Sequence, residues 1–115
     1  MQTGGNLLSG QSMGGAVDAE MIRHKLELET YTADWPAMAP HFARGVVVVC
    51  GPELDVLDAA VALAQDDATT VAGWMASGAL RKATDADGHA WTDGSPTFRF
   101  VIVAPFVVTE LVEAS

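Results

Sequence analysis

The stretch Gly10-Gln-Ser-Met-Gly14 is the part of this sequence that most resembles a catalytic motif, because it matches G-x-S-x-G. In α/β hydrolases this serine lies on a sharp turn between a strand and a helix, and a later acid and histidine complete the site. Here the motif lies in a glycine-rich segment with no strand pattern before it. A chain of 115 residues is also too short for that fold. We therefore do not expect a hydrolase.

The three histidines and the single cysteine lack the spacing of a metal centre. His24, His41 and His89 form no H-x-x-x-H pair, and none accompanies Cys50 at ligand spacing. The run 85–88 (Asp-Ala-Asp-Gly) resembles the start of a calcium loop but lacks the later ligands, so a turn is the simpler interpretation. Cys50 ends a run of valines and is predicted to be buried and unreactive. The sequence thus indicates no metal or other cofactor, and a non-catalytic role is favoured over an enzyme.

A few side chains remain as candidates for binding, namely Arg44, Asp66, Asp67, Trp91 and Arg99. Arg44 lies where a predicted helix meets a buried strand, and its guanidinium could hold a carboxylate or another anion with two hydrogen bonds. The alternative is structural: Arg44 would cap helix carbonyls or pair with Asp55 or Asp58.

Acidic residues dominate the charge, with 15 Asp and Glu against 6 Lys and Arg and a net charge of −9. Nucleic-acid binding needs clustered basic residues, and anionic membranes repel an acidic surface. No window approaches the roughly 20 apolar residues of a membrane span, and the N-terminus has no secretory signal pattern. One cysteine permits no intrachain disulfide. We expect a cytoplasmic protein.

The residue pattern predicts a flexible, glycine-rich leader over 1–17 and a single α+β domain over 18–115. In that domain three to four helices pack on a three- to four-stranded sheet. The helices are expected over 19–33, 35–42, 53–65 and 68–77, with one further helical turn near Trp91. Asp34 is expected to cap the second of these helices and Asp66-Asp67 the fourth, which Gly78 ends. The strands are expected over 46–50, 98–103 and 106–112, with 80–83 as a possible edge. The valine run in 46–50 has no polar alternation, which predicts a central strand covered on both faces. Pro105 suggests a bent edge strand between the last two strands.

Segment 54–82 has the form of a helix-turn-helix followed by a short strand, and it resembles the excisionase and MerR-type pattern. In DNA readers of this type the second helix carries basic and amide side chains into the major groove. Residues 68–77 contain no Lys, Arg, Asn or Gln, and Asp66 and Asp67 precede them. The helix pair is therefore expected, whereas DNA binding is disfavoured.

Several motifs together resemble a family of short bacterial proteins that is classed as a domain of unknown function. They are Phe42-Ala-Arg-Gly-Val-Val47, Leu54-Asp55, Ala62-Leu-Ala-Gln-Asp-Asp67, Trp74-Met-Ala-Ser-Gly78 with Leu80, Trp91, and Val101-Ile-Val-Ala-Pro-Phe-Val107. The resemblance covers about residues 26–112. It implies one compact domain and a bacterial origin, and it implies no activity.

Three hypotheses for function follow. The favoured one is a non-catalytic protein-interaction or regulatory module, with a protein partner or a second copy of the chain. The alternative is a small-molecule-binding protein or minor enzyme that uses Arg44, Arg99 and nearby acids. The third, a helix-turn-helix DNA binder, is disfavoured by the acidity of the chain.

Overall fold

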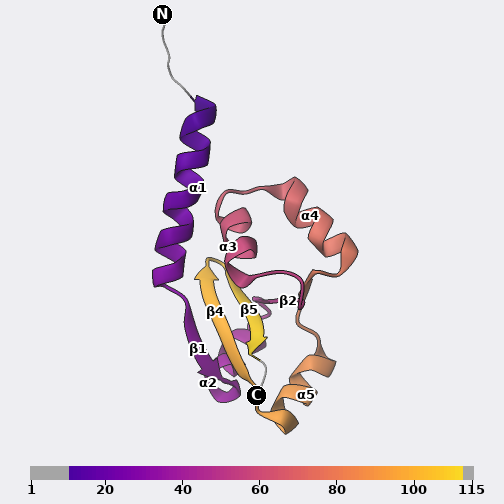
Figure 1. Cartoon of the computed structure of the whole chain (residues 1–115). Helices are drawn as coiled ribbons and strands as arrows, with labels where there is room; N and C mark the ends of the chain where they lie inside the picture. Colours follow the sequence, from indigo (N-terminus) through magenta and orange to yellow (C-terminus); the bar gives the residue numbers. More distant parts are fainter. Residues whose placement is uncertain (1–10, 113–115) are drawn as a thin grey trace, which may run out of the picture.

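The computed structural model describes residues 11–112, and it describes side chains from residue 19 onward (Figure 1). Residues 1–10 of the predicted flexible leader therefore lie outside the described residues. Residues 11–17, which were also assigned to the leader, form the first part of helix α1 (Gln11–Leu28).

Residues 11–112 form an α+β domain with five helices and five strands, whereas the sequence predicts three to four of each. After α1 the helices are α2 (Trp35–Ala43), α3 (Val56–Ala64), α4 (Ala68–Ser77) and α5 (Asp85–Gly94). The strands are β1 (Tyr31–Asp34), β2 (Val47–Cys50), β3 (Leu80–Lys82), β4 (Thr97–Val103) and β5 (Phe106–Val112).

The five strands form a mixed sheet in the order β1-β4-β5-β2-β3. Strand β2 pairs parallel with β5 and antiparallel with β3, and all four of its residues are buried. This confirms that the valine run is a central strand covered on both faces. Strands β4 and β5 form an antiparallel hairpin in the interior of the sheet, so the bent edge strand predicted near Pro105 is wrong. The turn at Pro105 instead joins two interior strands, and the edges are β1 and β3.

Each face of the sheet has its own hydrophobic core. One core joins α1 and α3 to the sheet through residues such as Leu57, Val101 and Val108. The other joins α2 and α5 to the opposite face, around Met38 and Phe98. Side chains alternate between the faces along each strand, which is why β4 and β5 contribute to both cores.

The second core is built mainly from aromatic rings. Trp91 contacts Trp35, Phe42 and Phe98, with ring centroids 5.1–6.2 Å apart in tilted or edge-on arrangements. Gly88 brings α5 very close to α2, since a Cβ at this position would lie 2.7 Å from Cζ of Phe42. This side of the domain is therefore closely packed.

The first predicted helix, 19–33, differs from the structure at both ends. It begins earlier, at Gln11, because adding residues to an existing helix costs little even where glycines weaken it. It ends at Leu28, and residues 31–34 form β1 instead, pairing with β4. Aromatic and β-branched residues such as Tyr31 and Thr32 favour a strand once a partner is available. Asp34 then caps α2 as predicted, accepting a hydrogen bond from the N–H of Ala37 at 3.1 Å.

The turn predicted over residues 85–88 is wrong, because these residues begin helix α5. The side chain of Thr84 accepts a hydrogen bond from the N–H of Asp87, whose carboxylate accepts one from the N–H of Thr84. This reciprocal capping box stabilises the first turn of the helix. An Asp-rich stretch therefore forms a helix start because a threonine stands three residues before the second aspartate.

The helix pair α3 and α4 is present as predicted, with β3 following it. The side chain of Asp67 accepts a hydrogen bond from the N–H of Thr70 and caps α4. The helix ends at Gly78, whose φ of 85° is left-handed and favours glycine.

Candidate functional site

A chain of alternating charges joins α1, α3, β4 and β5. Arg23 on α1 donates to Asp58 at 2.6 Å and to Asp55 at 3.2 Å. Arg99 on β4 donates to Asp55 at 3.4 Å and to Glu110 on β5 at 2.9 Å. The other carboxylate oxygen of Glu110 accepts the N–H of Val56, at the start of α3, at 3.1 Å. We call these five charged residues the Arg23–Arg99 network.

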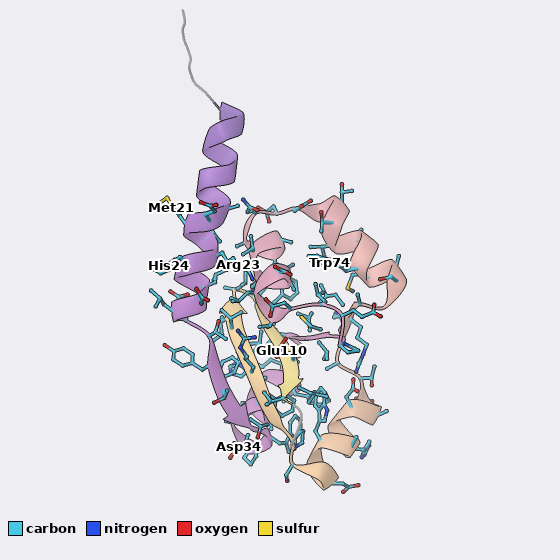
Figure 2. The ribbon with its side chains drawn as sticks, viewed as in Figure 1. Met21, Arg23, His24, Asp34, Trp74 and Glu110 are labelled. Atoms are coloured by element: carbon cyan, nitrogen blue, oxygen red, sulfur yellow. The ribbon has the colours of Figure 1, made fainter. Side chains whose placement is uncertain are left out.

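The Arg23–Arg99 network links α1 and α3 to strands β4 and β5. Figure 2 shows Arg23 directed from α1 toward the body of the domain, whereas Met21 and His24 point away from it. Hydrogen bonding to Glu110 raises the pKa of Arg99, and hydrogen bonding to Asp58 raises the pKa of Arg23. Both guanidinium groups are paired with carboxylates, so Arg99 is already engaged by this chain's own acids.

Arg44 lies apart from this network. It follows the last turn of α2, on the opposite face of the sheet from α3. Its side chain is exposed, and within residues 19–112 its one side-chain hydrogen bond is with the ring of His41, at 3.3 Å. The alternative in which Arg44 pairs with Asp55 or Asp58 is wrong, because these acids lie on the other face of the sheet, where Arg23 and Arg99 bind them. The structure therefore does not bring Arg44 and Arg99 together.

Trp91 is only 5% exposed and lies in the aromatic core. Its ring contacts three other aromatic rings, as described above. Because the core covers its ring, Trp91 has no accessible ring face with which a ligand could stack.

Cys50 is buried at the end of β2. Burial, reinforced by Glu110 and Asp55 nearby, raises the pKa of its thiol to about 12. The thiol therefore stays protonated at neutral pH and is a poor nucleophile.

A concave apolar groove lies beside α4. It consists of two hollows of about 290 and 220 Å³ that share Leu63, Val71 and Phe106. The remaining lining residues come from α3, the turn between α3 and α4, α4, β4, the β4–β5 turn, β2 and β3: Ala62, Asp66, Asp67, Ala68, Val103, Ala104, Pro105, Val48, Met75, Leu80 and Lys82. We call it the α4 groove.

The two ends of the α4 groove carry opposite charges. Asp66 and Asp67 line the first hollow, where α4 begins, and Lys82 lines the second. Asp66 is exposed and adopts a left-handed φ of 55° in the turn between the helices. The shared walls between these ends are apolar. The groove therefore has an apolar middle, an acidic end and a basic end.

Asp66 and Asp67, at the acidic end of this groove, are candidate binding residues from the sequence alone, whereas the groove itself is not predicted by the sequence. Val71, Trp74 and Met75 have the helical spacing of a core-facing stripe. In the structure Val71 and Trp74 are half-buried and Met75 is 43% exposed. The spacing indicates that a helix has an apolar face, and it does not indicate how completely that face is covered. The contribution of Phe106 and Pro105 depends on the position of the hairpin turn, which only tertiary structure sets.

The described residues contain neither a helix able to cross a membrane nor a cluster of metal ligands. Within residues 11–112, no helix combines the length and apolar character needed to cross a bilayer. Over the same part of the chain, three or more His, Cys, Asp or Glu side chains are nowhere grouped as metal ligands would be.

The fold and site define an acidic α+β domain with a mixed five-stranded sheet and an apolar groove. The chain belongs to a family described as a protein of unknown function, DUF2288, which matches residues 21–110. It is similar to a solved solution NMR structure, that of PA1075 from Pseudomonas aeruginosa. The two share 34% sequence identity with a TM-score of 0.72, over 82% of this chain and 87% of that one. No curated protein matches the chain.

Proposed function

We propose that this chain is a non-catalytic protein-interaction module whose binding site is the α4 groove. The partner is a protein segment that inserts apolar side chains and carries a Lys or Arg beside Asp66 and Asp67. Few kinds of chemical group line this site: apolar walls, two carboxylates and one amine. Such groups suit recognition better than bond making or breaking.

The observation that carries the proposal is the incomplete covering of α4. None of its ten residues is buried, although Val71, Trp74 and Met75 form one apolar face. Val71 and Met75 of this face line the groove, and covering them with another apolar surface would release water and stabilise the complex. A helix needed only for the core would be expected to bury at least part of that face completely.

The charge of the groove favours a partner with basic residues. The carboxylates of Asp66 and Asp67 lie at one end, and the net charge of −9 attracts cationic partners over a longer range. Lys82 at the other end would favour an acidic or C-terminal carboxylate group there. The alternative small-molecule site has less support, since Arg44 and Arg99 lie apart and Arg99 is paired.

A pair of synthetic peptides tests the proposal. One carries leucine and phenylalanine side chains followed by two lysines, and the other has the same apolar residues followed by two glutamates. Titration into ¹⁵N-labelled protein, followed by ¹H–¹⁵N NMR, is expected to shift the amide signals of Val71, Met75 and Phe106. The lysine peptide should bind more tightly, and the preference should weaken as salt is added.

Met75→Lys and Met21→Lys form a matched pair of variants for this titration. Both methionines are exposed, but only Met75 lines the groove. Met75→Lys should abolish the shifts, while Met21→Lys should leave them unchanged. Equal binding of both peptides, or equal loss in both variants, would contradict the proposal.

A further inference from the structure

We propose that two copies of this chain associate through strand β1, so that their sheets join into one of ten strands. This interface lies on another side of the domain from the α4 groove and does not depend on the function proposed for it. A two-fold axis at Thr32 would place each β1 antiparallel to the other.

The two edges of the sheet differ in how they are protected. Edge strand β3 presents Arg81 and Lys82, and basic side chains on an edge discourage pairing with another strand. Edge strand β1 has the sequence Tyr31-Thr-Ala-Asp34, with neither proline nor a basic residue. Its single charge, on Asp34, is used to cap α2. The β1 edge is therefore open to strand addition.

Exposed apolar side chains gather on the elements around this edge. Tyr31 is 60% exposed at the start of β1, and Leu28 is 70% exposed at the end of α1. Ile102, on the neighbouring strand β4, is 50% exposed and lies beyond the last residue that β1 pairs with, Phe100. Large apolar residues beside an unpaired strand provide the surface that an interface must bury.

A second copy suits this strand because β1 is complementary to itself in steric and charge terms. With Thr32 on the axis, Thr32 faces its own equivalent, a favourable cross-strand pair. Tyr31 faces the Ala33 position, which sets a large side chain against a small one. Asp34 faces the Thr30 position, so the register places no like charges opposite each other. Strand β1 has only four residues, and a two-fold contact repeats each favourable pair.

The net charge of −9 on each copy opposes association, so added salt should strengthen it. The full chain is expected to sediment as a dimer in analytical ultracentrifugation, with a dimer fraction that rises with sodium chloride concentration. Thr32→Lys places two ammonium groups against each other at the axis and should give monomer. Thr69→Lys, an identical change at an exposed position on α4, should leave the dimer intact.

A cross-linking measurement covers the case in which Thr32→Lys does not fold. Directly opposed residues of antiparallel strands lie close enough for a disulfide. With diamide as the oxidant, Thr32→Cys should form covalent dimers and Thr69→Cys should not, since Cys50 is buried. Monomeric wild-type protein at all concentrations and salt levels would overturn the proposal. So would a dimer that persists in folded Thr32→Lys, or equal cross-linking of the two cysteine variants, because either result places the contact elsewhere.

Discussion

Helices α3 and α4 follow each other in the chain and are both rich in apolar residues, yet their packing differs sharply. In α3, five of nine residues are buried: Val56, Leu57, Ala59, Ala60 and Ala62. In α4, none of ten residues is buried. Figure 1 shows α3 close against the sheet and α4 to one side of it.

The difference arises from where each helix meets the sheet. Ala59 and Ala60 are fully buried and let α3 approach the interior strands closely. Glu110 accepts the N–H of Val56 and fixes the start of the helix on β5. Helix α4 instead follows a short turn that carries it toward edge strand β3. An apolar helix face therefore becomes part of a core only where the topology supplies a second surface to cover it.

The largest expected effect comes from truncating one side chain in each of these two helices. Leu57→Ala, in α3, should lower the free energy of unfolding by about 2–5 kcal/mol, because Leu57 is 3% exposed and leaves a cavity. Trp74→Ala, in α4, should cost only about 1–2 kcal/mol, although it removes a larger side chain, since less area is buried. Urea unfolding measures both. A larger loss for Trp74→Ala would mean that α4 is a core helix.

The next effect uses two glycines inside helices. Gly88→Ala should destabilise by about 1–2 kcal/mol, because the new Cβ would overlap the ring of Phe42 in the closely packed aromatic core. Gly73→Ala in α4 meets nothing within 4 Å and should stabilise by up to about 1 kcal/mol through helix propensity. Thermal unfolding of both variants gives opposite shifts in Tm. Shifts of the same sign would show that α4 and α5 are equally packed.

The smallest expected effect on stability comes from changing an aspartate at the N-terminus of α4 or α5. Arg81 hydrogen-bonds to Asp87 and lowers the pKa of that carboxyl below its ordinary value. A lowered pKa in the folded state adds stability above the unfolded pKa of about 4, and this stability is lost as the pH falls through the folded value. Asp87→Asn should therefore cost about 1 kcal/mol at neutral pH, and the difference from wild type should shrink on acidification.

Asp67→Asn is the matched control at the start of α4. Asparagine caps helices about as well as aspartate, and Asp67 has no ion-pair partner among the described side chains. Its effect should stay below about 0.5 kcal/mol at any pH. A pH-dependent loss as large as that of Asp87→Asn would remove the contrast between the two helix starts.

Local patterns in the sequence were sufficient for many elements of the fold. The valine run before Cys50 predicted a fully buried strand, because only a strand covered on both faces tolerates no polar alternation. Asp34 and Asp67 predicted the starts of α2 and α4, and Gly78 predicted the end of α4, since capping depends on residues within one turn. The acidic composition and the lack of basic residues in 68–77 disfavour DNA binding, which stays a prediction.

Features that depend on distant partners were decided by the tertiary structure. Residues 31–34 became a strand because β4 was available to pair with them, and local pattern alone favoured a longer helix. Arg44 and Arg99 looked equivalent as candidate anion-binding residues, but the fold placed Arg99 among its own acids and Arg44 on the opposite face. Helical spacing showed that α4 has an apolar face. Whether that face became core or groove depended on which surface lay opposite, and burial is a property of two surfaces rather than one.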